Sequence, residues 1–271
     1  SIRDLTVTRR EFAAIRAATN QPFGVNLPIR YLQMDANEEK AIIDWLLGQG
    51  IHFATTSAGD PTRYTRLLKD AGVTVYHATA TLRGALKAVD AGVDGLIVEG
   101  AESAGIRNPE EVHTFALLQA VREKVDVPIV AAGGIVDGRG MAAAFALGAE
   151  GVTMGTRFVA SFESPVHLNY KNAIVSAPIT GTIMTDNPPR ARSRGLRTPY
   201  SVEVSEGKRE RLPRNATLDM LYVQGDVDNT SGAAGESAGL VHEIKSVQQI
   251  VDDTIASFWR EIDRLAGLRP R

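Results

Sequence analysis

The sequence has no cysteine among its 271 residues, and this absence excludes several classes of chemistry. Disulfides, thiolate nucleophiles, cysteine-bound zinc and cysteine-ligated iron–sulfur clusters all require that residue. A large excess of charge is also lacking, because the formal net charge is −2. Such a charge gives no general attraction to nucleic acid or to an anionic membrane. We therefore expect a small-molecule substrate, no metal and no nucleic-acid partner.

Long hydrophobic runs are missing as well. No apolar stretch is long enough to span a bilayer, and "SIRDLTVTRREF" lacks the apolar core of a signal peptide. Hydrophobic residues make up 44% of the chain and charged residues 23%, which is ordinary for a folded globular protein. These features predict a cytoplasmic protein without membrane contacts.

A unit of helix, glycine and buried strand recurs along the first part of the chain. Examples are "LLKDAGVTVYHATA", "ALKAVDAGVDGLIVEG" and "AFALGAEGVTMGT". In each of them a glycine ends the helix and an apolar run follows at once. The helices are expected to start at polar capping residues. These caps are Asn37, Thr81, Asn108 and Asp137.

Six short apolar runs predict parallel strands that are covered on both faces. They lie at 23–27, 51–55, 73–77, 95–99, 128–131 and 151–154. Strands that alternate with helices indicate an α/β fold, either a doubly wound open sheet or a (β/α)8 TIM barrel. The regular spacing favours the barrel. Because a barrel needs eight strands, we expect this chain to lack the first strand or strands; a complete six-stranded open sheet is the alternative.

The region after the sixth strand has a different character. We therefore divide the chain into a barrel part, 1–160, and a C-terminal extension, 161–271, that forms a lid and helices. A helix is expected from Ser164 and an irregular excursion over 178–215, followed by a Gly/Ser-rich loop over 224–239. The last helix is expected to pack through apolar residues at helical spacing. These are Val251, Ile255, Phe258, Ile262 and Leu265.

Two successive strands end in glycine turns, at Gly133-Gly134 and at Gly155-Thr156. A single turn needs one glycine, but a phosphate held between two turns needs bare backbone on both sides. The turns after the last two strands of a barrel are a common phosphate site. This pattern predicts a bound phosphate group, to which Thr156 can add a hydroxyl.

The stretch "VPIVAAGGIVDGRGMAAAFALGAEGVTMGTRF" resembles the hallmark of an FMN-dependent family that includes nitronate monooxygenases (2-nitropropane dioxygenases) and FabK-type enoyl reductases. "PFGVNLP", "AGVDGLIVEGAESAG", "ESPVHLNYKNAI" and "AGESAGLVHEIKSVQQIV" are similar to further family blocks, in the family's order. The likeness covers nearly the whole chain. A Q-A-P-M-like motif of the family's first strand is absent, in agreement with the missing strands.

The resemblance implies a flavoprotein oxidoreductase with FMN as cofactor and NADPH or NADH as a candidate reductant. It places the FMN phosphate at Gly133, Gly134, Gly155 and Thr156, and ribityl or ring contacts at Asn26 and Glu99. The substrate would be a small conjugated or CoA/ACP-linked molecule. The exterior of a barrel leaves the oligomeric state open, with a homodimer as one option.

The family's catalytic histidine position, in a segment like E-x-G-G-H-x-G, corresponds here to Ile106 in "ESAGIRNPE". Isoleucine cannot transfer a proton. His77 ends a predicted strand on the active face, so it is the catalytic candidate, with a packed strand-end histidine as the equal alternative. Structural or surface roles are favoured for the other histidines and for nearby charged residues. These are His52, His113, His167, His242, Glu102, Arg107 and Lys171.

Four functions remain open at this point. Reduction of an enoyl thioester through flavin N5 is the first, and oxidation of a nitronate with O2 is the second, which Ile106 opposes most directly. The third is a non-redox protein that binds FMN or a phosphorylated ligand. The fourth, a phosphate-sugar barrel enzyme without flavin, explains the glycines but not the other family blocks.

Overall fold

The computed structural model describes residues 5–32, 36–187 and 191–268. The chain divides into two compact units, of which unit 1 comprises 1–97 with 124–128 and unit 2 comprises 98–123 with 129–271. The boundary predicted at residue 160 does not coincide with this division into compact units, and it stays a prediction. No helix of the described segments is long and apolar enough to cross a membrane.

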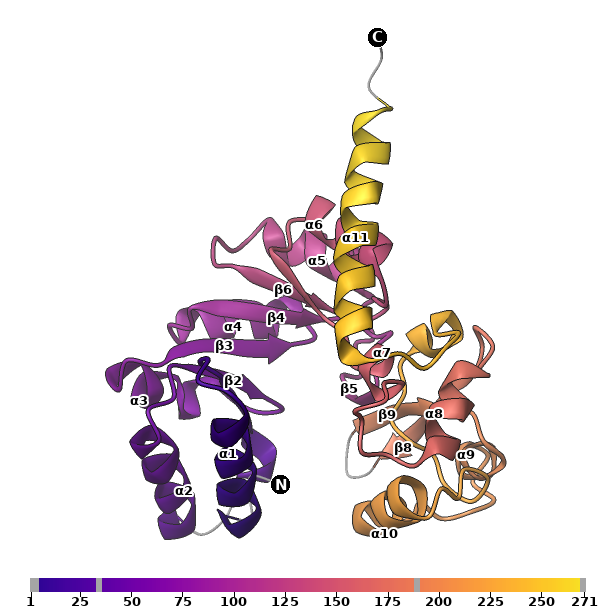
Figure 1. The fold of residues 1–271 in the computed structure, drawn as a ribbon. Helices are drawn as coiled ribbons and strands as arrows, with labels where there is room; N and C mark the ends of the chain where they lie inside the picture. Colours follow the sequence, from indigo (N-terminus) through magenta and orange to yellow (C-terminus); the bar gives the residue numbers. More distant parts are fainter. Residues whose placement is uncertain (1–4, 33–35, 188–190, 269–271) are drawn as a thin grey trace. The chain divides into compact units, whose positions relative to one another are not determined.

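A parallel sheet has six strands in the order β1-β2-β3-β4-β6-β7 (Figure 1). The strands follow one another in chain order, as in a (β/α)8 barrel. All six predicted strands are confirmed, with shifts of one or two residues at their ends. They are β1 (Val25–Pro28), β2 (Phe53–Ser57), β3 (Thr74–Thr79), β4 (Gly95–Glu99), β6 (Ile129–Ala132) and β7 (Gly151–Thr153).

Unit 1 consists of short βα repeats in which one sheet face is fully buried. Leu27, Ala54 and Val75 have 0% exposure on that face, and α3 and α4 pack against β3. Thr81 caps α4 as predicted, because its side chain accepts a hydrogen bond from Gly84 N at 3.0 Å. The helices are α1 (Leu5–Ala18), α2 (Ala36–Gly48), α3 (Thr65–Asp70) and α4 (Leu82–Asp90), with 3-10 turns η1 (Ile29–Tyr31) and η2 (Pro61–Arg63).

Unit 2 contains β6, β7 and the C-terminal part of the chain. Here α11 runs beside α6 (Figure 1), and Phe145 meets Phe258 edge to face at 5.1 Å. A Cβ on Gly138 would lie 2.0 Å from Phe258 N, so glycine permits this close helix approach. The helices are α5 (Thr114–Arg122), α6 (Gly138–Ala146), α7 (Thr156–Val159), α8 (Leu168–Val175), α9 (Pro199–Ser205), α10 (Arg214–Leu218), η3 (Asp219–Val223), η4 (Glu236–Leu240) and α11 (Val247–Ala266).

The prediction of an irregular excursion over 178–215 is wrong. Strands β8 (Thr182–Asn187) and β9 (Ala191–Leu196) form an antiparallel sheet with β5 (Gly105–Arg107), in the order β5-β9-β8. Threonine, serine and arginine interrupt the apolar residues of these strands, so they lack the apolar run that identifies the parallel strands. Polar side chains such as Thr182 and Thr185 are nevertheless buried there, at 7% and 8% exposure.

Three predicted helix starts are also corrected. Asn37 lies inside α2, α5 begins at Thr114 after the cap residue His113, and α8 begins at Leu168 after His167. Asn108 instead closes a turn, because its side chain accepts a hydrogen bond from Glu110 N at 2.9 Å. An asparagine or serine followed by proline suits a turn as well as a helix start, and the turn is formed here.

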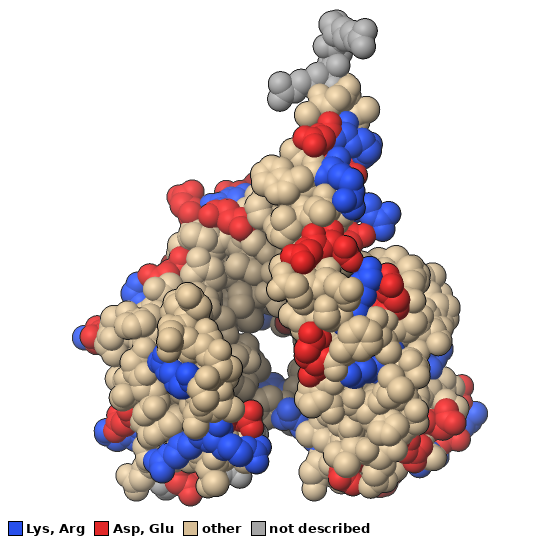
Figure 2. Space-filling model, in the orientation of Figure 1, with Lys and Arg blue, Asp and Glu red and all other residues tan. Residues whose placement is uncertain are grey.

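The predicted packing face of α11 is largely wrong. Ile250, Thr254 and Phe258 form the buried face, whereas Val251 and Ile255 are 41% and 44% exposed. The buried face contains small polar residues because α6 approaches it closely, and these residues are invisible to an apolar periodicity. Figure 2 shows acidic and basic side chains gathered on the same helix.

Candidate functional site

The two glycine turns of unit 2 have different structural reasons for their glycines. Gly133 and Gly134, after β6, have φ of +104° and +73°, a region that favours glycine. Gly155, after β7, has an ordinary φ of −96°. A Cβ added at Gly155 would meet no atom within 4 Å. The fold itself therefore does not require glycine at 155, and a side chain there would occupy space open to a ligand.

The loop after β4 packs directly against the first glycine turn. A Cβ on Gly133 would lie 2.7 Å from Thr114 Oγ1 and 2.8 Å from Ser103 Oγ. Glu102 organises this loop, because its carboxylate accepts hydrogen bonds from Thr114 N and Thr114 Oγ1, both at 2.9 Å. Glu102 thus binds protein groups, in agreement with the structural role favoured for it.

Thr156 is held by a segment from the Gly/Ser-rich region far along the chain. Gly235 N donates to Thr156 Oγ1 at 3.0 Å, and Glu236 N donates to Glu102 O at 2.9 Å. Gly235 and Glu236 therefore join the turn after β7 to the loop after β4. The only sequence signal for this segment is its place in the family-like block "AGESAGL". Because Thr156 Oγ1 accepts from Gly235, its own proton is left to donate to an anion.

The backbone N–H groups of Gly134 and Gly155 donate to no acceptor within the described part of the chain. The N-terminus of α6 has fewer free amides for a ligand, because Arg139 N and Gly140 N already donate to the Asp137 side chain at 3.0 and 3.1 Å. The predicted Asp137 cap is thereby confirmed. Two free amides and one hydroxyl donor suit a phosphate, so the turns rather than the helix end supply the donors.

Asn26 lies in unit 1 on the accessible face of β1. Thr55 Oγ1 and Ser57 Oγ donate to Asn26 Oδ1 at 3.1 and 3.3 Å. These two bonds orient the amide and leave its NH2 group free to donate to a ligand. Asn26 is thus a positioned donor, and its contact with a flavin stays a prediction.

His77 lies on the opposite face of the same strands. The register pairs Asn26 with Thr55 and His77 with Thr56, and adjacent residues of a strand point to opposite faces. His77 Nδ1 shares a 2.7 Å hydrogen bond with Thr56 Oγ1, and the ring is only 4% exposed. The catalytic role of His77 stays a prediction, but this environment favours the packed strand-end alternative.

A substitution at His77 separates the two roles. Burial lowers the His77 pKa to about 4, while the charges of Asp60 and Lys87 act in opposite directions. Between about 6.5 and 4 the unfolded chain binds a proton that the folded chain does not, so stability falls as the pH drops through this window. We expect His77→Gln to remove this pH dependence, measured by urea unfolding at pH 7 and pH 4.5. A loss of turnover at unchanged stability would instead support catalysis.

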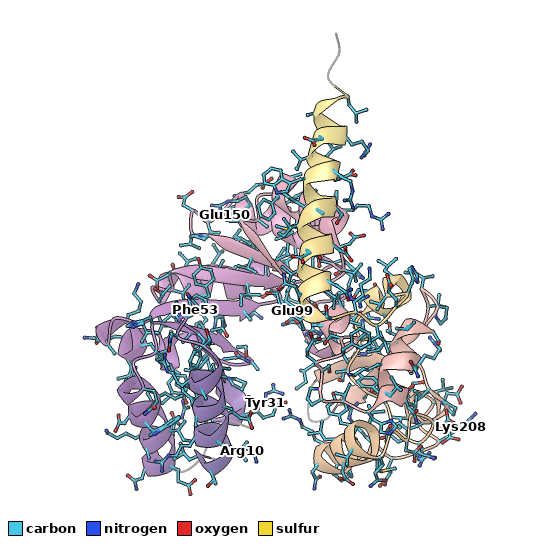
Figure 3. All side chains as sticks on the ribbon, in the orientation of Figure 1. Arg10, Tyr31, Phe53, Glu99, Glu150 and Lys208 are labelled. Atoms are coloured by element: carbon cyan, nitrogen blue, oxygen red, sulfur yellow. The ribbon has the colours of Figure 1, made fainter. Side chains whose placement is uncertain are left out.

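Glu99 and Arg107 form an ion pair at the end of β4, where Figure 3 labels Glu99. Arg107 Nη2 contacts Glu99 Oε1 at 2.8 Å, and Arg107 Nη1 donates to Gly100 O at 3.2 Å. Arg107 is 6% exposed, so its interpretation as a solvated loop arginine is wrong. Glu99 remains partly accessible and can still contact a ligand.

Ile106 sits between these residues in the strand β5, opposite Ser193 of β9. It is half-buried, and its side chain has no ionisable group. In the described residues no cluster of three His, Asp or Glu side chains is placed to hold a metal ion.

The remaining histidines and Lys171 have structural or surface positions. His167 caps α8 by accepting from Asn169 N at 3.1 Å, which agrees with the favoured structural role. Lys171 is 7% exposed and donates to Phe162 O at 3.3 Å, so a solvated-face role is wrong. His52 and His113 are exposed.

The chain matches known proteins along most of its length. A model of the nitronate monooxygenase family matches residues 5–257. The chain is 29% identical to "(3aS,4S,5R,7aS)-5-hydroxy-7a-methyl-1-oxo-octahydro-1H-indene-4-carboxyl-CoA dehydrogenase" of Rhodococcus jostii, over 98% of this chain and 86% of that protein. It is 27% identical to a nitronate monooxygenase of Paraburkholderia phytofirmans, over 83% and 72% of the two chains.

A solved structure shows the same fold. FabK from Thermotoga maritima superposes with a TM-score of 0.87 and 40% identity, over 99% of this chain and 85% of that one. This likeness assigns the six-stranded parallel sheet to the TIM-barrel class that the βα repeat predicts. The two glycine turns therefore follow adjacent strands of a TIM-barrel sheet.

Proposed function

Because the chain belongs to the nitronate monooxygenase family, an enzyme family whose named members are oxidoreductases, we propose that it is an FMN-dependent oxidoreductase. The observation that carries this proposal is Gly155, whose conformation needs no glycine and whose missing side chain leaves open space. A bound phosphate explains that space, and FMN carries a phosphate.

The described residues fit FMN at its phosphate end. Gly134 N, Gly155 N and the Thr156 hydroxyl would hold the phosphate, with Gly133 shaping the turn. Within unit 2, Glu99 would contact the ribityl chain or ring. The flavin contact of Asn26, which lies in unit 1, stays a prediction from the family resemblance. When bound, FMN supplies the hydride transfer that none of these side chains can perform.

We further propose that the acceptor is a conjugated thioester, reduced at the expense of NADPH or NADH. One named relative is a carboxyl-CoA dehydrogenase, and an acyl group is carried on CoA as a thioester. Arg107 orients the Glu99 carboxylate, and Glu102 fixes the loop beside the glycine turns. Because Ile106 has no ionisable group, the proton that follows hydride transfer comes in this proposal from water or from His77, whose catalytic role stays a prediction.

The first experiment is the visible absorption spectrum of the purified protein, with the released chromophore identified after denaturation. We expect FMN, bleached by NADPH or NADH under anaerobic conditions. Bleaching by a nitronate and not by nicotinamides would favour nitronate oxidation with O2 instead. Failure of the folded protein to bind added FMN at micromolar concentration would contradict the flavoprotein proposal.

A second candidate function is a non-redox homologue that binds FMN or another phosphorylated ligand. Ile106 favours it, because the family position for a catalytic histidine holds a residue that transfers no proton. Bound FMN that neither nicotinamides nor a nitronate bleaches would support this candidate. A small-molecule ligand is common to both functions, and a homodimer stays a prediction.

A further inference from the structure

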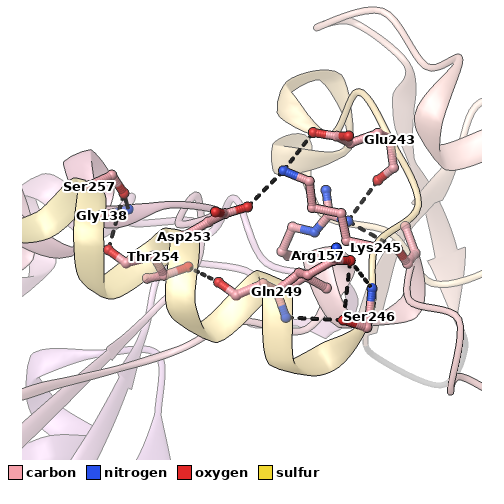
Figure 4. Close-up of polar contacts among 11 residues, drawn as sticks. Gly138, Arg157, Glu243, Lys245, Ser246, Gln249, Asp253, Thr254 and Ser257 are labelled. Carbon is pink, nitrogen blue, oxygen red and sulfur yellow. Dashed lines mark hydrogen bonds and ion pairs between the residues drawn. The ribbon is translucent and has the colours of Figure 1, made fainter.

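A second cavity of about 570 Å³ lies in unit 2 where α6, α7 and α11 meet. Figure 4 shows its polar contacts, made by α7, by the segment before α11 and by the buried face of α11. None of the glycines of the two turns lines it. Its charged lining residues are Asp137, Arg139, Arg157, Glu243, Lys245, Asp253, Arg260, Glu261 and Arg264.

Arg157 is the most buried cation of this cavity, with 7% exposure. Its Nη2 donates to two neutral carbonyls, Ala160 O at 3.0 Å and Glu243 O at 2.7 Å. Its Nε is buried and has no hydrogen-bond partner. A buried charged donor without an acceptor costs free energy, and an acceptor bound in the cavity that Arg157 lines would offset that cost.

The carboxylates of the cavity are already engaged. Glu243 and Asp253 both contact Lys245 Nζ at 2.7 Å. Asp137 contacts Arg139 at 2.8 Å, and Glu261 contacts Arg264. The other two lining cations, Arg157 and Arg260, have no carboxylate within 4.0 Å among the described residues. The lining therefore contains two cations that no carboxylate of the described residues neutralises.

The hydroxyls of Ser257 and Thr254, which also line the cavity, are used within the protein. Ser257 Oγ accepts from Gly138 N at 2.9 Å and donates to Thr254 O at 3.1 Å. The Thr254 hydroxyl donates to Ile250 O at 2.7 Å. Arg157 Nε and the Arg260 guanidinium therefore remain as the charged donors for a ligand.

We propose that this cavity binds an oxyanion, the phosphate or carboxylate group of a small molecule, between Arg157 and Arg260. Guanidinium groups match the geometry and charge of such anions. The site is separate from the glycine turns, since neither they nor Thr156 line the cavity. Thr156 Oγ1 accepts from Gly235 N, while Arg157 donates to Glu243 O. It accounts for the unpartnered Nε, which the proposed flavin site does not use.

The test is calorimetric titration of the full chain with inorganic phosphate, and separately with acetate, at low ionic strength. The titration is done in the Gly155→Val background, where the added side chain keeps phosphate away from the glycine turns without adding a competing anion. This arrangement makes the outcome independent of the proposed flavin chemistry. We expect one saturable anion site, and the tighter of the two anions identifies the headgroup.

Two variants locate the site. Arg260→Gln should weaken anion binding about threefold and leave the fold unchanged, because Arg260 is exposed. Arg157→Gln should weaken it at least about tenfold. Arg66→Gln, an exposed arginine of α3, is the matched control and should bind as the native chain does. If Arg157→Gln does not fold, Arg260→Gln alone decides. Absence of saturable binding, or equal binding by Arg260→Gln and Arg66→Gln, would overturn the proposal.

Discussion

Replacing Gly155 with valine is expected to weaken flavin binding about 100-fold and to leave the fold intact. Gly155 has a φ of −96°, which valine adopts freely, and a Cβ there meets no protein atom within 4 Å. The added side chain would instead occupy the space in front of the Gly155 and Thr156 backbone. Loss of two charge-assisted hydrogen bonds to a phosphate is worth on the order of 3 kcal/mol, or about 100-fold in affinity.

Gly48→Val is a matched control for this experiment. Gly48 ends α2, and its Cβ would also meet nothing within 4 Å. Both variants should unfold within a few degrees of the native chain by circular dichroism. Titration with FMN, followed by flavin fluorescence, should show a weaker Kd for Gly155→Val only. Native-like FMN affinity in Gly155→Val would remove the phosphate from this turn and with it the main support for the flavin site.

The barrel strands were predictable because parallel strands buried on both faces must be apolar along their length. "GLIVE" at β4 and "IVAA" at β6 have this character, and glycines mark the preceding helix ends. The two glycine turns were predictable for a different reason: a strand end and a tight turn are both local features of the sequence. The open space beside Gly155, by contrast, could be recognised only from the three-dimensional structure.

Other parts of the site depend on contacts that local patterns do not contain. Gly235 reaches Thr156 across 79 residues, and Arg107 is buried by its pairing with Glu99. Strands β8 and β9 are polar, so their pairing with β5 is set by tertiary structure and not by an apolar period.

The orientation of His77 shows a different limit. Alternation along β3 is readable from the sequence, but the sequence does not say which of the two faces is covered by helices. The pairing of Thr56 with His77 and of Thr55 with Asn26 settles that the two candidate residues lie on opposite faces. The position of His77 at a strand end is therefore weak evidence for a catalytic role.

Restoring a histidine at position 106 is expected to create nitronate oxidation in a chain that binds FMN. Ile106 is half-buried in β5 and is paired with Ser193, so a side chain of similar size is tolerated there. A positioned general base contributes roughly 100- to 10,000-fold. We therefore expect Ile106→His to raise the rate with a nitronate at least about 100-fold above the native chain.

The pH profile and a control variant identify the cause of such a gain. A rate that rises with pH through the ordinary histidine pKa, near about 6.5, is the mark of an imidazole that accepts the substrate's proton. Ile106→Gln introduces a polar side chain without a titrating group and should gain nothing. Oxygen consumption with a nitronate substrate measures both variants. If Ile106→His binds FMN and still gains no activity, more than the base differs from a nitronate monooxygenase, and the pocket itself is built for another substrate.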